Sequence, residues 1–158
     1  MKYGLVEIEP HFGLYAIHDK MTNVEIGIIA LDTIFPEGLL NSLDDNTYDK
    51  MMQLTIKNRM CHIRSFEIHD EYRGQGHAVE VLVNLDLLLS DMGYDVVTLA
   101  PYPVEDDKHF KSREIHWKTL LKLYTRANYN PIASFIKDMG FSQVGLIMGK
   151  RISGGVFV

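Results

Sequence analysis

The segment Ile68-His-Asp-Glu-Tyr-Arg-Gly-Gln-Gly-His-Ala78 joins two stretches of different periodicity. Before it, residues 61–69 have the mixture of apolar and polar side chains of a half-buried strand. After it, residues 77–92 carry apolar side chains at intervals of three and four, as one face of a helix does. A β-branched run over 95–100 is typical of a buried strand. The order strand, turn, helix and strand over 61–100 therefore predicts a βαβ unit with parallel strands.

Three further strands are predicted before this unit. Residues 4–9 alternate apolar and acidic side chains, and the strand-like stretches 12–18 and 24–31 follow after turn-forming residues, which is typical of a meander. Between residues 36 and 60 the apolar side chains instead recur at intervals of three and four. One or two helices are therefore predicted between the meander and the βαβ unit.

Two more helices are predicted after the unit. Residues 111–126 have a basic amphipathic pattern. A second helix is expected from Asn130 to Gly140, because Asn130 is a suitable N-cap, the proline after it suits the first helical position, and Gly140 suits a left-handed C-cap. Residues 141–158 predict two strand-like pieces around Ser153-Gly-Gly.

These elements predict an α/β protein of mixed α+β type, with a central mixed sheet of about six to seven strands flanked by helices. Neither a repeat nor a low-complexity tract divides the sequence, and no Pro/Gly/Ser linker is present. We therefore expect one domain over residues 1–158.

The composition excludes several classes of protein. The chain has 158 residues, 46% of them hydrophobic, and a formal net charge of −5, which argues against a dedicated nucleic-acid binder. Cys61 is the single cysteine, so neither an intrachain disulfide nor a zinc site of several thiolates is expected. The sequence contains no apolar run of signal-peptide or membrane-spanning length. We therefore expect a cytoplasmic protein that binds no membrane, no nucleic acid and no metal.

The turn of the βαβ unit has the features of an anion site. Its glycines let the main chain approach a ligand closely, and the first N–H groups of the following helix have no intrahelical partner. The turn can also be only a tight connection that needs glycine for its geometry. A Walker loop does not fit, because no Gly-Lys-Ser/Thr follows, and a dinucleotide fingerprint does not fit, because Val79 stands where its third glycine is required.

The segment resembles the acyl-CoA-binding motif of the GNAT acetyltransferases. The pattern of that family is Gln/Arg-x-x-Gly-x-Gly/Ala, which Arg73, Gly76 and Ala78 match. A second segment, Asn130-Pro-Ile-Ala-Ser-Phe-Ile-Lys-Asp-Met-Gly-Phe141, resembles the Asn-x-x-Ala…Gly-Phe segment of the family. The resemblance covers residues 61 to about 145 and implies a GNAT-like sheet with a βαβ acyl-CoA-binding core.

The resemblance implies acetyl-CoA as cosubstrate and assigns roles to matched positions. The N–H groups of Gln75 to Val79 are expected to hold the CoA pyrophosphate, and the main chain of Phe66 to Ile68 is expected to pair with pantetheine like an added strand. The acyl group is expected where the strands 61–69 and 95–100 splay apart, with a strand N–H as the oxyanion donor. The predicted cofactor-binding residues are Phe66, Ile68, Arg73, Gly74, Gln75, Gly76, His77, Ala78, Val79 and Asn130.

The transfer to an amine requires a base, because an amine of lysine type has a pKa of about 10.4 and arrives protonated. Glu67 is the first candidate, although it can also be an ordinary solvent-facing strand residue, and His69 and His116 are alternatives.

Members of the family often carry a tyrosine that protonates the departing thiolate, four residues before the glycine of Gly-Phe. In the alignment above, that position holds Ile136. Tyr124 and Tyr129 are therefore the candidate acids.

The sequence thus predicts an N-acetyltransferase in which a primary amine, of a small molecule or a protein, attacks acetyl-CoA directly in a ternary complex. The alternative is a GNAT-like module that has lost catalysis and serves as an acyl-CoA-binding, structural or regulatory domain, which Ile136 favours. The acceptor cannot be transferred by analogy, because the family places two helices between its first two strands and this chain places its helical stretch, 36–60, after the third. The resemblance also allows a homodimer.

Overall fold

The computed structural model describes residues 2–102, 112–136, 141 and 144–152. Its strands are β1 (Tyr3–Glu9), β2 (Leu14–Asp19), β3 (Val24–Asp32), β4 (Met60–Ile68), β5 (Val96–Leu99), β6 (Asn130–Ile136) and β7 (Val144–Arg151). Its α-helices are α1 (Glu37–Leu40), α2 (Asp45–Lys57), α3 (His77–Asp91) and α4 (Arg113–Arg126), and two short 3-10 turns are η1 (Pro10–Phe12) and η2 (Asp70–Tyr72).

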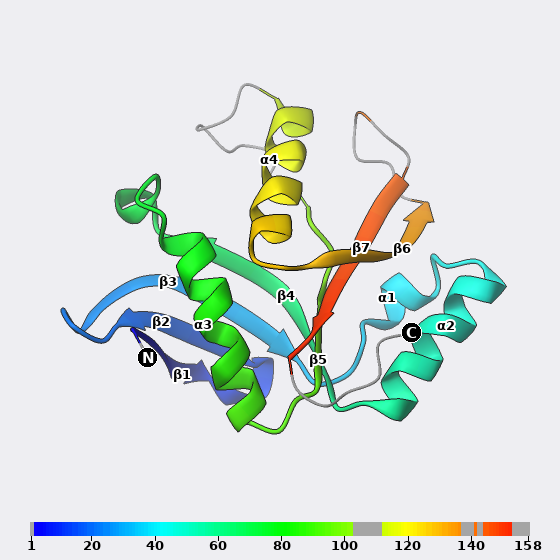
Figure 1. Cartoon of the computed structure of the whole chain (residues 1–158), viewed down its shortest axis with the longest axis horizontal. Helices are drawn as coiled ribbons and strands as arrows, with labels where there is room; N and C mark the ends of the chain where they lie inside the picture. The colour runs from blue at the N-terminus through cyan, green and yellow to red at the C-terminus, as the bar shows by residue number, and fades with distance from the viewer. Residues whose placement is uncertain (1, 103–111, 137–140, 142–143, 153–158) are drawn as a thin grey trace.

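The strands form one seven-stranded sheet in the order β1-β2-β3-β4-β5-β7-β6 (Figure 1). The β4–β5 pair is parallel and the other neighbours are antiparallel. The predicted meander, the βαβ unit and its parallel strands are therefore confirmed, as is the mixed sheet. The predicted loop after residue 101 and the strand-like piece after Ser153 fall almost wholly outside the described residues.

Helices cover both faces of the sheet. Successive side chains of a strand point to opposite faces, and in β5 the side chains of Val96 and Val97 belong to different apolar clusters. The cluster of Val97 includes side chains of α3 and α4, whereas that of Val96 includes side chains of α1 and α2. Thus α3 and α4 lie on one face and α1 and α2 on the other (Figure 1).

The starts of two helices are fixed by side-chain caps. The carboxylate of Asp44 accepts a hydrogen bond from the backbone N–H of Thr47 at 2.8 Å and begins α2. The hydroxyl of Ser112 accepts one from the N–H of Ile115 at 3.2 Å and begins α4. The helix predicted over 111–126 is therefore confirmed from Arg113 onward. No helix in the described ranges is both long and apolar enough to cross a bilayer.

The helix predicted from Asn130 to Gly140 is wrong, because Asn130–Ile136 is the edge strand β6. Its backbone pairs with β7, and the ring of Phe135 covers Gly145 on that strand, where an added Cβ would lie 2.5 Å from Phe135 Cζ. Burial of Phe135 beside α2 and strand pairing together outweigh the local helix signals. Pro131 is tolerated because an edge strand can lack one N–H donor.

Candidate functional site

The parallel pair β4–β5 separates after four residue pairs. Pairing runs from Met60↔Val96 to Ile63↔Leu99, where β5 ends, while β4 continues to Ile68. We call this point of separation the fork. Beyond it, no strand of the described residues pairs with the β5-facing edge of β4, so backbone N–H and C=O groups there are available to a ligand.

A β-bulge lies at the fork. The register between β3 and β4 passes from Ala30↔Ser65 to Leu31↔Ile63, which leaves Arg64 as an extra residue of β4. A bulge bends its strand and disrupts the local ladder. The Arg64 side chain is held at the opposite edge, since its Nη1 lies 2.6 Å from Asp32 Oδ1. The bulge therefore interrupts the β3–β4 ladder at the level where β4 and β5 stop pairing.

A cavity of about 540 Å³ occupies the fork, between β4, the turn before α3, the end of β5 and α4. Its size is within the usual range for ligand sites. We call it the fork cavity. Seven of the residues predicted from the sequence line it, together with the alternative base His116: they are Phe66, Glu67, Ile68, Arg73, Gly74, Ala78 and Tyr124.

The glycine turn has the conformation that an anion site requires. Gly74 and Gly76 have φ angles of 77° and 79°, in the left-handed region where glycine is favoured. Gly76 is the N-cap residue of α3, and no side chain caps the helix there. A Cβ at either glycine would meet nothing within 4 Å. No side chain or backbone atom therefore crowds the two glycines, and the first N–H groups of α3, which have no intrahelical partner, can bind an anion.

Arg73 braces this turn against β4. Its Nε donates to the carbonyl oxygen of Ile68 at 2.9 Å and lies 3.5 Å from Asp70 Oδ1. Its Nη2 lies 3.4 Å from Oε1 of Glu67, a side chain that is 55% exposed. The structure thus brings the predicted base and the predicted anion-binding turn together.

His77 is held at the first turn of α3. The Tyr3 hydroxyl lies 2.9 Å from both His77 Nδ1 and Glu80 Oε2. A carboxylate only accepts, so Tyr3 donates its proton to Glu80 and accepts from His77 Nδ1–H. Nε2, the other ring nitrogen of His77, takes no part in these two contacts. Neither His77 nor its neighbours Gln75, Gly76 and Val79 line the fork cavity itself.

Tyr124 is one of two phenols among the described residues that line the fork cavity, the other being Tyr102. Burial raises its pKa to about 12, so the hydroxyl stays protonated at neutral pH. It stands four residues before Asn128, which has a φ of 72° and therefore adopts the left-handed conformation favoured by glycine, and an aromatic residue, Tyr129, follows. This spacing is that of the tyrosine before Gly-Phe. The alignment that placed Ile136 at that position assumed a helix there, and the structure shows a strand instead.

Two further predicted residues, Tyr129 and Asn130, do not line the fork cavity. Tyr129 is fully buried. The centroids of its ring and the Tyr124 ring are 5.9 Å apart, and Lys150 Nζ lies 4.4 Å from the centroid of the Tyr129 ring. Burial raises its pKa well above the usual value. Asn130 is exposed and pairs with Gly149 at the start of β6. Neither residue lines the cavity, so the structure does not bring them to the predicted chemistry.

The two histidine alternatives differ in position. His116 of α4 is 6% exposed and lines the fork cavity. His69 lies outside it, and its Nε2 is 2.7 Å from Glu25 Oε2. Sequence reasoning missed the rest of the α4 wall, formed by Thr119, Leu120 and Leu123. The spacing of three and four from His116 is the signal that identifies this face.

Comparisons with known proteins identify the fold. No protein-family model matches the chain, and no curated protein matches it. A variant of the spermidine N-acetyltransferase SpeG from Vibrio cholerae is similar with a TM-score of 0.54 at 15% identity, over 88% of this chain and 63% of that chain. A GNAT-family acetyltransferase from Listeria monocytogenes is similar with a TM-score of 0.56 at 9% identity, over 88% of this chain and 64% of that chain.

The chain therefore has the fold of the GNAT acetyltransferases, as the motif over 68–78 predicted. It spans less than two thirds of the length of these two structures, both of which are described as acetyltransferases.

Proposed function

We propose that the protein is an N-acetyltransferase that transfers the acetyl group of acetyl-CoA to a primary amine. The observation that carries the proposal is the continuity of the fork cavity with the open glycine turn through Arg73 and Gly74. A diphosphate has N–H donors at the turn, and an extended pantetheine arm has an unpaired strand edge beside it. The two features support one ligand that is anionic at one end and strand-like at the other.

The cavity provides groups for each step of the transfer. Glu67, or His116 on the opposite wall, accepts the proton that the ammonium must lose before attack. A backbone N–H of β4 beyond Ile63 stabilises the oxyanion that develops as the new C–N bond forms. Tyr124, kept neutral by burial, donates its proton to the thiolate as the C–S bond breaks. The products are an amide and free CoA thiol.

Spermidine is the first acceptor to test, because the Vibrio cholerae neighbour is described as acting on spermidine. The side chain of Glu67 is a half-exposed carboxylate of the cavity wall and suits a cationic amine. The alternative, a GNAT-like module without catalysis, was favoured because Ile136 stood where a tyrosine acid was expected. Tyr124 lines the fork cavity and is a candidate acid, so we favour the enzyme.

Calorimetric titration with acetyl-CoA tests the binding half of the proposal. The wild type is expected to bind, and Gly76→Asp is expected to weaken the affinity at least about tenfold, because a carboxylate would then stand beside the diphosphate. Gly76→Asn is the matched control, since it puts a side chain of the same size at the same φ of 79° without the negative charge. Equal affinity in all three proteins would contradict the site.

Release of free thiol from acetyl-CoA tests the catalytic half. The rate is expected to depend on spermidine or on another primary amine in a panel that includes a lysine peptide. Binding of acetyl-CoA without turnover on any amine would instead support the acyl-CoA-binding module.

A further inference from the structure

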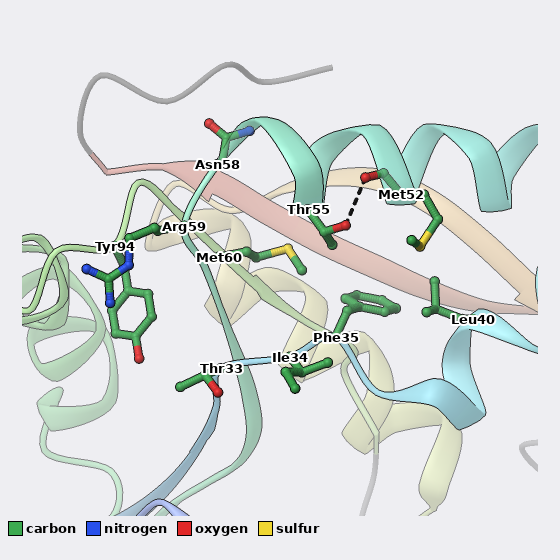
Figure 2. Close-up of a pocket in the computed structure, with 10 residues that line it drawn as sticks. All are labelled: Thr33, Ile34, Phe35, Leu40, Met52, Thr55, Asn58, Arg59, Met60 and Tyr94. Atoms are coloured by element: carbon green, nitrogen blue, oxygen red, sulfur yellow. Dashed lines mark hydrogen bonds between the residues drawn. The ribbon is translucent and has the colours of Figure 1, made fainter.

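A second cavity, of about 410 Å³, lies at the other end of the β4–β5 pair. Figure 2 shows its wall, which consists of the link after β3, both α1 and α2, and the segments that lead into β4 and β5. It reaches Met60, the first residue of β4, whereas the fork cavity begins at Ile63. The two cavities share no lining residue, so this one is a separate site.

The body of the second cavity is apolar and suits an aromatic ring. The ring of Phe35 and the thioethers of Met52 and Met60 line it from three segments of the chain (Figure 2). Sulfur atoms contact aromatic rings favourably. Phe35 is 3% exposed, and its ring packs edge-on against His62 with centroids 5.2 Å apart, so this wall is preformed.

The rim of the second cavity carries one kind of charge. Of the described residues that line it, Arg59 is the charged one, and none is acidic. The Arg59 guanidinium carbon lies 5.3 Å from the centroid of the Tyr94 ring, which also lines the cavity. Stacking on a ring fixes the plane of the guanidinium, and a fixed guanidinium suits two-point recognition of a carboxylate.

We propose that this cavity binds a small aromatic carboxylate, with its ring among Phe35, Met52 and Met60 and its carboxylate on Arg59. Size, apolar lining and a single cation at the rim agree with the general form of small-molecule sites. The proposal does not depend on the acetyltransferase activity, because no residue of the fork cavity takes part.

Calorimetric titration with hydrocinnamate and with hydrocinnamyl alcohol tests the proposal. The two probes share a ring and a chain and differ in the charge that Arg59 would recognise. Arg59→Gln is expected to weaken binding of the carboxylate about tenfold and to leave binding of the alcohol unchanged. Lys57→Gln is the matched control, because it removes the same charge from an exposed residue that does not line the cavity.

Thr55→Leu tests the place of binding, because Thr55 lines the cavity from α2 and the larger leucine side chain would take up part of the space that the probes need. Binding of both probes is expected to be lost, with thermal unfolding measured to show that the variant is folded. The proposal is overturned if the wild type binds neither probe saturably, if acid and alcohol respond alike to Arg59→Gln, or if folded Thr55→Leu still binds. Loss of hydrocinnamate binding in Gly76→Asp would place the probe at the fork cavity instead.

Discussion

Arg73 Nη2 lies 3.4 Å from Glu67 Oε1, which joins the turn before α3 to the second half of β4. The two side chains are 27% and 55% exposed, so the pair adds little to the free energy of unfolding. Its effect is positional, because Arg73 is held at the same time by the carbonyl of Ile68. A change at either residue therefore reaches both the proposed anion site and the proposed base.

Glu67→Gln is expected to lower kcat by about 10²–10⁴-fold, the usual contribution of a positioned base, while the affinity for acetyl-CoA stays the same. Initial rates of thiol release at saturating acetyl-CoA and amine measure the first quantity, and calorimetry measures the second. Glu71→Gln is the control, since Glu71 is exposed in η2 and does not line the fork cavity. An unchanged kcat in Glu67→Gln would leave His116 as the candidate base.

Tyr124→Phe is expected to lower kcat by about 10²-fold or more without weakening acetyl-CoA binding, because the ring remains and only the proton donor is lost. Burial raises the pKa of Tyr124 to about 12, so the wild-type hydroxyl remains a donor through the whole neutral range. Steady-state rates with the same amine measure the effect. Tyr48→Phe, on the exposed side of α2, is the control. Equal losses in both variants would argue against a role for the Tyr124 hydroxyl.

His62 makes the stability of the fold depend on pH. Burial, and then the nearby Arg64, lowers its pKa from 6.5 to about 4. The unfolded chain therefore binds a proton at His62 that the folded state does not bind. The contribution of His62 to the free energy of unfolding is complete above pH 6.5 and is lost as the pH falls through about 4. The loss corresponds to about 3 kcal/mol.

Urea unfolding at pH 7.5 and pH 4.5 measures this dependence. His62→Gln is expected to lose less stability between the two pH values than the wild type does, although it is less stable at pH 7.5 because it disturbs the 2.8 Å contact with Thr98 Oγ1. His11→Gln, at an exposed position, should follow the wild type. If all three proteins show the same pH dependence, His62 is not its source.

Gly27→Ala is expected to destabilise the fold by about 1–3 kcal/mol, as overpacking in a core does. A Cβ at Gly27 would collide with the backbone oxygen of Glu67 on the neighbouring strand. Gly38→Ala is the matched control, because its Cβ meets nothing within 4 Å and alanine favours a helix over glycine. Thermal unfolding measures both variants. A Gly27→Ala protein as stable as the wild type would show that β3 and β4 can move apart at no cost.

The sequence predicted those elements whose local pattern agrees with their surroundings. In α3, the apolar side chains of Leu82, Leu85 and Leu89 repeat along one helix face, and the structure buries all three. The β-branched run of β5 is buried on both faces, as a central strand requires. The motif over 68–78 fixed the order of strand, turn and helix, because only glycine readily takes the two left-handed positions in it.

The parts that sequence reasoning missed depend on contacts between distant residues. The spacing of apolar side chains between Asn130 and Gly140 fits a helix, and only the pairing of β6 with β7 makes its first part a strand. The alignment of this segment placed the position of the family's tyrosine at Ile136, which the structure shows to lie in a strand. Tyr124, four residues before Asn128, is the proposed acid. An asparagine that adopts a glycine conformation is not recognised by a pattern that demands glycine.

The short β4–β5 ladder has a mechanical consequence. Among the described strands, the four residue pairs from Met60↔Val96 to Ile63↔Leu99 are the sheet's only connection between the β1–β4 half and the β5–β7–β6 half. If a mechanical force pulls the two halves apart, we expect these four β4–β5 pairs to separate first. Each half would then come away as an antiparallel unit with its own hydrogen bonds intact.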